Sequence, residues 1–186
     1  MEAYLDHAAS TPARPEVIDA MVPWLADHPG NPSGAHKSAR EARRAIDDVR
    51  DLVAELVGGD PGDVVFTSGG TEADNLAVDG VLGATGGVAV CSAAEHPAVL
   101  EPVQESGGII APTDKAGRVD LAALAEILDS VDDVALVSVM LANNETGVIN
   151  PVAEAAALVA EKSPAAVVHT DAVQATAWVD LAAYCA

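Results

Sequence analysis

Basic residues are scarce in this 186-residue sequence, which has nine lysines and arginines against 29 acidic residues and a formal net charge of −20. A chain with this charge repels phosphate backbones and anionic lipid surfaces. We therefore expect neither nucleic acid nor a membrane among its partners. Most of the carboxylates are expected to form an acidic, solvated surface.

Long apolar runs are also missing. No stretch of about 18 uncharged apolar residues could span a bilayer, and the first residues, MEAYLDHAAS, lack the basic region and apolar run of a signal peptide. A cytoplasmic location is the resulting expectation. The two cysteines, Cys91 and Cys185, lack the close spacing of a metal site or a disulfide framework. Cys91 ends an apolar run, which predicts a buried thiol.

Half of the residues are apolar, and the length suffices for one ordinary domain, or part of a larger one, with a sizeable core. A helix is predicted over 15–24, with Pro15 in its first turn. A longer helix is predicted within 35–57, where apolar residues recur at steps of three and four and Gly58-Gly59 ends the pattern. One face of that helix should be buried, formed by Ile46, Val49, Val53, Leu56 and Val57.

From residue 64 onward, short valine-rich runs alternate with helical segments. Buried strands are predicted at 64–66, 88–92, 135–141 and 166–169. Helices are predicted at 71–83, 97–106, 120–129 and 151–161, with Asp120 as an N-cap. This alternation predicts an α/β fold with a mostly parallel sheet and helices on both faces, undivided by a linker. In such sheets, ligands bind at the carboxyl ends of the strands.

Glycines and polar residues follow the first two predicted strands. The turn TSGGTEADN brings a glycine pair and Thr71 to the start of a helix, where amide groups and the helix dipole favour a phosphate. The alternative is a tight turn capped by Thr71. No lysine follows, so this is not the P-loop of nucleotide triphosphatases. After the second strand, His96 could stack on a planar ligand, or simply cap the next helix.

Amides and a carboxylate follow the last two predicted strands. The segment ANNETGVINP could hold a ligand oxygen with an asparagine amide, although Asx-rich loops are commonly turns. The segment TDAVQA contains Asp171 and Gln174. A buried carboxylate needs a positive partner, and an aspartate facing a ring nitrogen would keep that nitrogen protonated. The alternative for Asp171 is a cap on the following turn.

Taken in order, these motifs resemble those of one family. The sequence is similar to cysteine desulfurases of the NifS/IscS type, within the class V aminotransferase group of fold-type I pyridoxal-phosphate enzymes. The stretches that carry the resemblance run from residue 4 to residue 175: YLDHAASTP, GNPSGAH, VVFTSGGTEADNLA, EHPAVL, LANNETGVINP and HTDAVQA. Six motifs in the family's order favour the functional interpretation of each over the structural one.

The resemblance implies a role for each candidate residue. Gly70 and Thr71 would bind the phosphate of pyridoxal 5′-phosphate, and His96 would stack on its ring and move protons. Asn144 and Gln174 would bond the 3-oxygen of the cofactor, and Asp171 would pair with its ring nitrogen. The implied reaction converts L-cysteine to L-alanine and leaves a persulfide for iron–sulfur cluster assembly or for thiolation of a cofactor or tRNA. The implied enzyme is a homodimer that delivers sulfur to acceptor proteins.

The resemblance covers only about the first half of the family's length. Residues 1–14 would form an N-terminal arm, and 15–186 the first part of the three-layer cofactor-binding domain. The family's cofactor lysine and nucleophilic cysteine would fall beyond residue 186, and Lys37, Lys115, Lys162, Cys91 and Cys185 do not match them. We therefore expect the isolated chain to be inactive. Two alternatives stay open: a selenocysteine lyase or other class V enzyme, and a non-catalytic truncated protein that acts as a binding or assembly partner.

Overall fold

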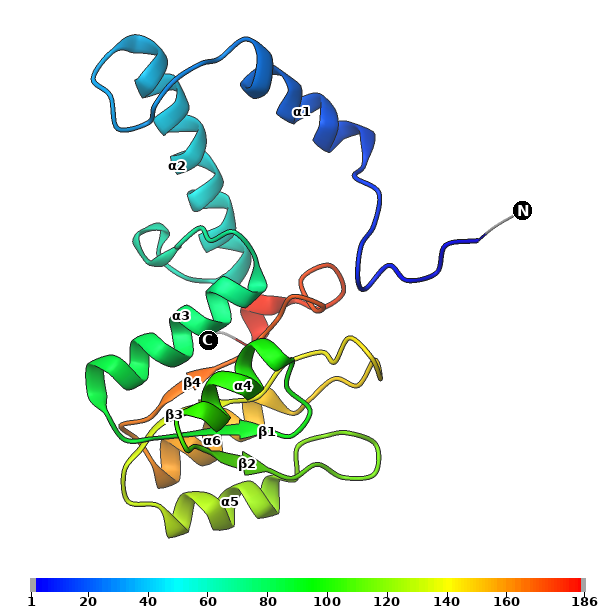
Figure 1. Ribbon diagram of the computed structural model, residues 1–186, viewed down its shortest axis with the longest axis vertical. Coiled ribbons are helices and arrows are strands. Elements are labelled where there is room, and N and C mark those ends of the chain that lie inside the picture. Colours follow the sequence, from blue (N-terminus) through cyan, green and yellow to red (C-terminus); the bar gives the residue numbers. More distant parts are fainter. Residues whose placement is uncertain (1–2, 185–186) are drawn as a thin grey trace. The chain divides into compact units, whose positions relative to one another are not determined.

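The computed structural model describes residues 3–184, so Cys185 lies outside the described residues (Figure 1). These residues form two compact units, a division that the sequence pattern does not indicate. One unit comprises the described residues up to Val65 and those from Leu181 onward, and the other is Phe66–Asp180. All six candidate site residues belong to the second unit. The predicted boundary between residues 14 and 15 stays a prediction.

The second unit is built on a parallel four-stranded sheet in the order β2-β1-β3-β4. Its strands are β1 (Val88–Ser92), β2 (Ile109–Ala111), β3 (Val134–Ser138) and β4 (Val167–His169). In the register, Cys91 pairs with Ile110 on one side and with Ser138 on the other, and Ser138 pairs with His169. Since all strands are parallel, their carboxyl ends share one edge of the sheet.

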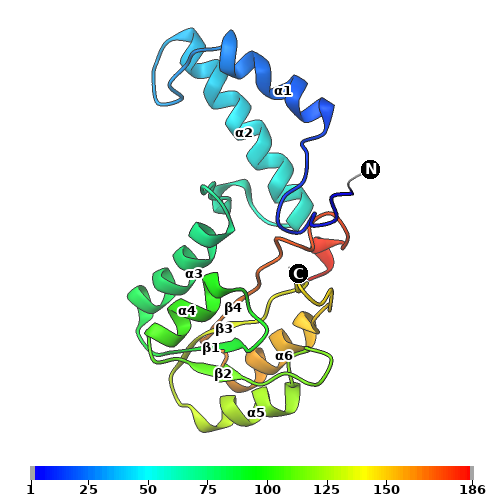
Figure 2. The ribbon, with the colours of Figure 1, turned by 45° about the vertical axis from the view of Figure 1, so that its right-hand side comes forward.

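Helices cover both faces of this sheet (Figures 1 and 2). The pair α3 (Gly70–Thr85) and α4 (Pro97–Glu105) pack against each other and against β1. The pair α5 (Leu121–Ser130) and α6 (Val152–Lys162) pack together on the other face. Right-handed crossovers between parallel strands produce this arrangement. The predicted α/β fold with three layers is confirmed.

The ends of these helices follow from local sequence. The side chain of Asp120 accepts hydrogen bonds from the amides of Ala122 and Ala123, as its predicted role as N-cap of α5 requires. Pro97 stands in the first turn of α4, where its missing N–H costs nothing. Each of the four helices begins and ends within two residues of its predicted bounds.

An apolar core lies between β1, β3 and the α3–α4 pair. Its fully buried members are Val78, Ala89, Cys91, Val99, Val103 and Leu136. The prediction that Cys91 is buried is confirmed, and burial together with the nearby Glu95 carboxyl raises the pKa of its thiol to about 12. Cys91 is therefore a packing residue and not a nucleophile.

Two strand predictions differ from the structure. Residues 64–66 lie outside the four strands of the described sheet, and Val65 and Phe66 are exposed. An apolar run shows that a segment suits a buried strand, but not that a neighbouring strand is present. Strand β2 was not predicted, because its three residues between Gly108 and Pro112 are too few to show a period.

The strand predicted at 135–141 is shorter in the structure, because β3 ends at Ser138. Main-chain pairing with the segment after β4 nevertheless continues. The amide of Val139 donates to the carbonyl of His169 at 3.1 Å, and the amide of Leu141 donates to the carbonyl of Asp171 at 2.9 Å. These two bonds extend the sheet to the segment that carries Asp171.

The first unit contains α1 (Pro15–Ala26), α2 (Lys37–Val57) and the short turns η1 (Pro61–Asp63) and η2 (Leu181–Ala183). The His36 side chain accepts a hydrogen bond from the amide of Ala39 at the start of α2. Gly58, with φ of 71°, ends the helix as predicted, since this left-handed conformation favours glycine.

The predicted buried face of α2 is wrong in this structure. Val49 and Leu56 are 48% and 55% exposed, whereas the buried residues of α2 are the alanines at 39, 42 and 54. The short turns η1 and η2 are the described elements of this unit that pack closely on α2, and they are too small to cover an apolar face. Among the helices of residues 3–184, none has the length and apolarity needed to cross a membrane.

Candidate functional site

The glycine pair leads into the first turn of α3, at the carboxyl-end edge of the sheet. Gly69 is the N-cap and has extended backbone, and no side chain caps the helix from that position. The amides of the first helical residues, including Gly70 and Thr71, therefore have no partner within the helix. A methyl group on Gly70 would lie 3.0 Å from Cγ2 of Val173, so this turn lies against the turn that follows Asp171.

Glu72 fixes the segment before this helix. Its Oε2 accepts hydrogen bonds from the amide of Ser68 at 2.7 Å and from the Ser68 hydroxyl at 2.5 Å. These bonds hold the pKa of Glu72 below its ordinary value. The hydroxyl of Thr67 donates to the carbonyl of Gly69 at 3.0 Å. Hydrogen bonds from Thr67 and Ser68, before the glycine pair, to Gly69 and Glu72 thus fix the backbone around this pair.

His96 is the N-cap of α4. Its Nδ1 accepts a hydrogen bond from the amide of Ala98 at 3.1 Å, so the structural alternative of a capping histidine is realised. The ring is nevertheless exposed. A ring that is fixed at one nitrogen and open on its face is able to stack on a ligand, so capping and stacking are compatible.

Asn144 and Gln174 line the same hollow, which has a volume of about 280 Å³. Asn144 is exposed in a turn that its neighbour Asn143 builds. The Asn143 Oδ1 accepts from the amide of Thr146 at 2.8 Å, and its Nδ2 donates to the carbonyl of Ala94 at 3.0 Å. The predicted pair of amides is therefore brought together.

Asp171 is buried, with 8% of its surface exposed. Its Oδ1 accepts a hydrogen bond from the amide of Val173 at 2.9 Å, which is the cap on the following turn that the sequence left as an alternative. In residues 3–184, its carboxylate forms no ion pair with a lysine or arginine. Capping satisfies one lone pair but does not neutralise the charge, so the positive partner is still required.

Two groups of candidate residues form at this edge. Gly70 and Thr71 lie beside the turn of Asp171, and Asn144 lies with Gln174 in the hollow. His96 and Asp171 both act electrostatically on the Asp74 carboxyl: the charge of Asp171 raises its pKa, and that of His96 lowers it. The lining of the hollow does not include Gly70, Thr71, His96 or Asp171.

Buried polar residues that the sequence did not single out lie under this edge. Glu95 is 7% exposed, and its Oε1 accepts from the amide of Met140 at 2.6 Å. The Ser138 hydroxyl forms hydrogen bonds with Oε2 of Glu95 at 3.1 Å and with Nδ1 of His169 at 2.9 Å. Nε2 of His169 lies 3.6 Å from Oδ1 of Asp74.

The two carboxyls of this group are hard to ionise. Burial raises the pKa of Asp74 to about 6, and the charge of Asp171 adds to the effect, while His96 opposes it. Burial also raises the pKa of Glu95 to about 7, against the lowering effect of its hydrogen bonds from Met140 and Ser138. Burial lowers the pKa of His169. Such displaced values are typical of functional sites.

These raised values predict a pH dependence of stability. From the ordinary pKa values of 3.8 and 4.5 up to about 6 and 7, these two carboxyls bind more protons in the folded chain than in the unfolded chain, while the lowered pKa of His169 opposes their effect. The free energy of unfolding should therefore fall as pH rises through this window, by up to about 1.4 kcal/mol per pH unit and group. Urea unfolding at about pH 5 and about pH 8 measures it. Glu95→Gln should flatten the dependence, and parallel wild-type and variant curves would contradict the assignment.

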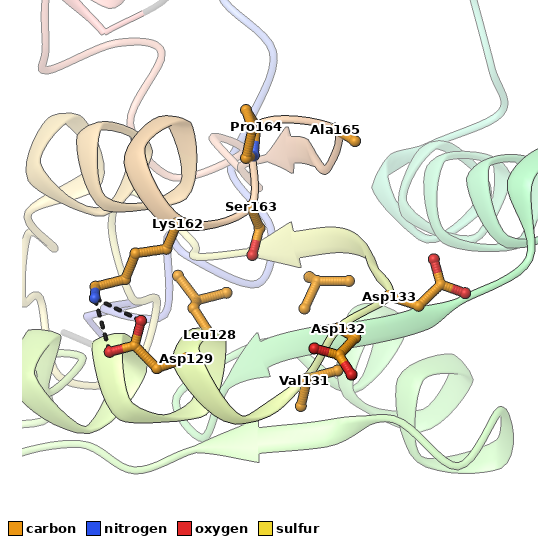
Figure 3. Close-up of a pocket in the computed structure, with 10 residues that line it drawn as sticks. Leu128, Asp129, Val131, Asp132, Asp133, Lys162, Ser163, Pro164 and Ala165 are labelled. Carbon is orange, nitrogen blue, oxygen red and sulfur yellow. Dashed lines mark hydrogen bonds and ion pairs between the residues drawn. The ribbon is translucent and has the colours of Figure 1, made fainter.

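A separate hollow of about 330 Å³ lies at the opposite, amino-terminal end of the sheet (Figure 3). There the Nζ of Lys162 donates to both carboxylate oxygens of Asp129 at 2.7 Å. Asp132 and Asp133 also line this hollow. Lys162 is thus held away from the candidate site, in agreement with its sequence context.

This fold defines a class of protein: a parallel α/β protein in which ligands bind at the carboxyl ends of the strands, where the candidate residues of this chain lie. The sequence profile of the family described as Aminotransferase class-V matches residues 3–181. The chain belongs to this family.

Curated relatives are cysteine desulfurases. The chain is 45% identical over 185 residues to an IscS-like cysteine desulfurase of Mycobacterium tuberculosis, covering 93% of this chain and 46% of the relative. It is 42% identical over 181 residues to the cysteine desulfurase IscS of Dictyoglomus turgidum, covering 93% of this chain and 45% of the relative. The chain thus spans about half the length of the curated relatives it matches.

Solved structures show the same fold. A NifS-like protein superposes with a TM-score of 0.87 at 32% identity, over 92% of this chain and 49% of the other. A NifS-like protein from Rickettsia africae superposes with a TM-score of 0.84 at 34% identity, over 92% and 48%. The protein SspA, in a complex with cysteine, superposes with a TM-score of 0.82 at 31% identity, over 92% and 51%. The fold predicted from the sequence resemblance is confirmed.

Proposed function

We propose that this chain is the cofactor-binding part of a cysteine desulfurase and that its cofactor is pyridoxal 5′-phosphate. One observation carries the proposal. Asp171 is a buried carboxylate with no lysine or arginine partner in residues 3–184, and it lies beside the first turn of α3. A ligand with a cationic ring nitrogen and a phosphate would satisfy both features.

The residues present fit this ligand. Gly70 lacks a side chain where the helix start meets Val173, and together with Thr71 it would take the phosphate. The exposed His96 ring would cover one face of the cofactor ring. The amides of Asn144 and Gln174, which share one hollow, would bond the 3-oxygen.

When bound, pyridoxal phosphate supplies an electron sink for the electron pair at the substrate α-carbon. Asp171 would hold a proton on the ring nitrogen, which would make the ring an effective sink. With L-cysteine as substrate, the carbon–sulfur bond breaks and a sulfur–sulfur bond forms with an acceptor thiol. L-Alanine and a persulfide result, and no external oxidant or reductant is consumed.

The wider setting belongs to the same proposal. The relatives' names support a desulfurase over other class V enzymes, and SspA binds cysteine. Sulfur-acceptor proteins, a role in iron–sulfur cluster or tRNA sulfur supply and a homodimer are inferred from the sequence resemblance. A cytoplasmic location is part of the proposal as the expectation from the sequence pattern.

Thr71→Val tests the phosphate site. The probes are 4-deoxypyridoxine 5′-phosphate, which has no aldehyde to react with lysines, and 4-deoxypyridoxine, which lacks the phosphate as well. We expect the variant to bind the phosphorylated probe about tenfold more weakly, because a hydrogen bond to a charged group is lost. Titration calorimetry of both probes measures it. Equal weakening for both probes would contradict a phosphate contact.

A turnover assay separates binding from catalysis. The lysines at 37 and 115 lie in α2 and in an exposed turn, and Lys162 is ion-paired with Asp129. None of them matches the family's cofactor lysine. We therefore expect the 186-residue chain to bind the probe but to release no sulfide from L-cysteine. A visible absorbance band that borohydride fixes onto one of these lysines would overturn the assignment.

A further inference from the structure

Four polar side chains form a continuous line of contacts beneath the candidate site. Glu95 follows β1, Ser138 ends β3, His169 ends β4, and Asp74 projects from α3. The distances are 3.1 Å from Glu95 Oε2 to Ser138 Oγ, 2.9 Å from Ser138 Oγ to His169 Nδ1, and 3.6 Å from His169 Nε2 to Asp74 Oδ1. Three members thus come from the ends of sheet strands or just after them, and one comes from α3.

The hydrogen atoms in these contacts are interdependent. The two contacts of Ser138 need two hydrogens, and its hydroxyl supplies one. The second must come from a protonated Glu95 or from Nδ1–H of His169. If Glu95 carries it, a neutral His169 has its hydrogen on Nε2, which then attracts an ionised Asp74. If His169 supplies it from Nδ1, the bare Nε2 of a neutral ring repels an ionised Asp74.

In the second case, either Asp74 is protonated or the ring takes a second proton. Each favourable arrangement therefore leaves Glu95, His169 and Asp74 with one negative charge in total, whereas separate ionised carboxyls and a neutral ring would carry two. We propose that Glu95, Ser138, His169 and Asp74 form a proton-sharing chain that retains one extra proton at neutral pH and so limits the negative charge beside Asp171.

The surroundings support this assignment. Titratable groups that face the chain are His96 on α4, Asp171 after β4 and Cys91 on β1. Fully buried side-chain nitrogens and oxygens in the described part of the chain all have hydrogen-bond partners. No group of three potential metal ligands converges in residues 3–184.

Glu95 and His169 would then be positioning residues, since they set the charge around Asp171 without touching the ligand. This consequence for the cofactor rests on the proposed function. The proton-sharing chain itself does not, because its contacts join side chains of this chain alone.

NMR spectroscopy of the labelled 186-residue chain tests the proposal. The ring nitrogens of His169 and the carboxyl carbons of Glu95 and Asp74 are followed from about pH 5.5 to about pH 8.5, since Glu95 titrates at about 7. We expect the His169 signals to change with the same midpoint as the Glu95 carboxyl. A separate His169 midpoint, or two ionised carboxyls beside a neutral His169 ring at neutral pH, would overturn the proposal.

Glu95→Gln supplies a sharper test. The amide oxygen must accept from the amide of Met140, so its NH₂ donates to Ser138, which in turn donates to Nδ1 of His169. His169 should therefore stay in the Nε2–H form over the upper part of the pH range. Glu101→Gln on the exposed side of α4 is the control and should behave as wild type. A pH-dependent His169 in Glu95→Gln, matching wild type, would refute the proposal.

Ser138→Ala should uncouple His169 from Glu95, and the wild-type and Glu95→Gln spectra decide the question even if this variant fails to fold. Binding of 4-deoxypyridoxine 5′-phosphate to wild type is measured in parallel. Coupled signals without binding would retain the proton-sharing chain and reject the cofactor assignment. Binding without coupled signals would do the reverse.

Discussion

Asp171→Asn is expected to weaken binding of 4-deoxypyridoxine 5′-phosphate by about 10- to 100-fold. The substitution keeps the side-chain oxygen that accepts from the amide of Val173, so the turn after β4 should persist. It removes the charge that would pair with the ring nitrogen, and a charge-assisted hydrogen bond contributes about 1.5–3 kcal/mol. Titration calorimetry near neutral pH measures the change.

Asp79→Asn on the exposed side of α3 is the matched control, because it removes the same formal charge away from the candidate site. It should bind the probe as wild type does. If both variants lose affinity equally, the effect is one of net charge, and Asp171 has no special contact with the ring.

Leu136→Ala is expected to cost about 2–5 kcal/mol of unfolding free energy, the range for emptying a large apolar site in a packed core. Leu136 lies in β3, is fully buried and packs within the core under α3 and α4. Urea unfolding followed by circular dichroism measures the loss in the unit that contains the sheet.

The control for this substitution is Leu76→Ala on α3. Leu76 is 54% exposed, so its truncation should change stability by no more than about 0.5 kcal/mol. Similar losses for both variants would indicate that the interior of this unit is loosely packed, contrary to the structure.

Regular elements in the second unit were largely predictable from the sequence. The strand at 88–92 has the bounds that the valine-rich run predicts, and α5 begins after Asp120 as the capping pattern indicates. Segments whose secondary structure or burial depends on residues far away in the sequence were not predictable in this way. Residues 64–66 have the composition of a buried strand, yet they lie outside the described sheet. The apolar stripe of α2 is regular, yet the short turns of its own unit leave Val49 and Leu56 exposed.

The candidate site shows the same contrast. Asp171 and His96 stand out because they follow apolar runs, and the structure places both at the carboxyl-end edge. Asp74 lies within one of the family's motifs and Glu95 within another, but the sequence pattern predicts no role for either, because a helical or loop carboxylate ordinarily faces solvent. A signal for Asp74 was present: it precedes the buried Val78 by four residues and so lies on the same face of α3.

Strand β4 is three residues long, and within residues 3–184 it is paired with one strand, β3. Edge strands this short open readily in local fluctuations, and their amides exchange with solvent early. Opening β4 would release His169 from Ser138 and Asp171 from Leu141 together. We therefore expect the opening of β4 to limit how long the site stays assembled. A ligand held by Asp171 would slow hydrogen exchange along β4.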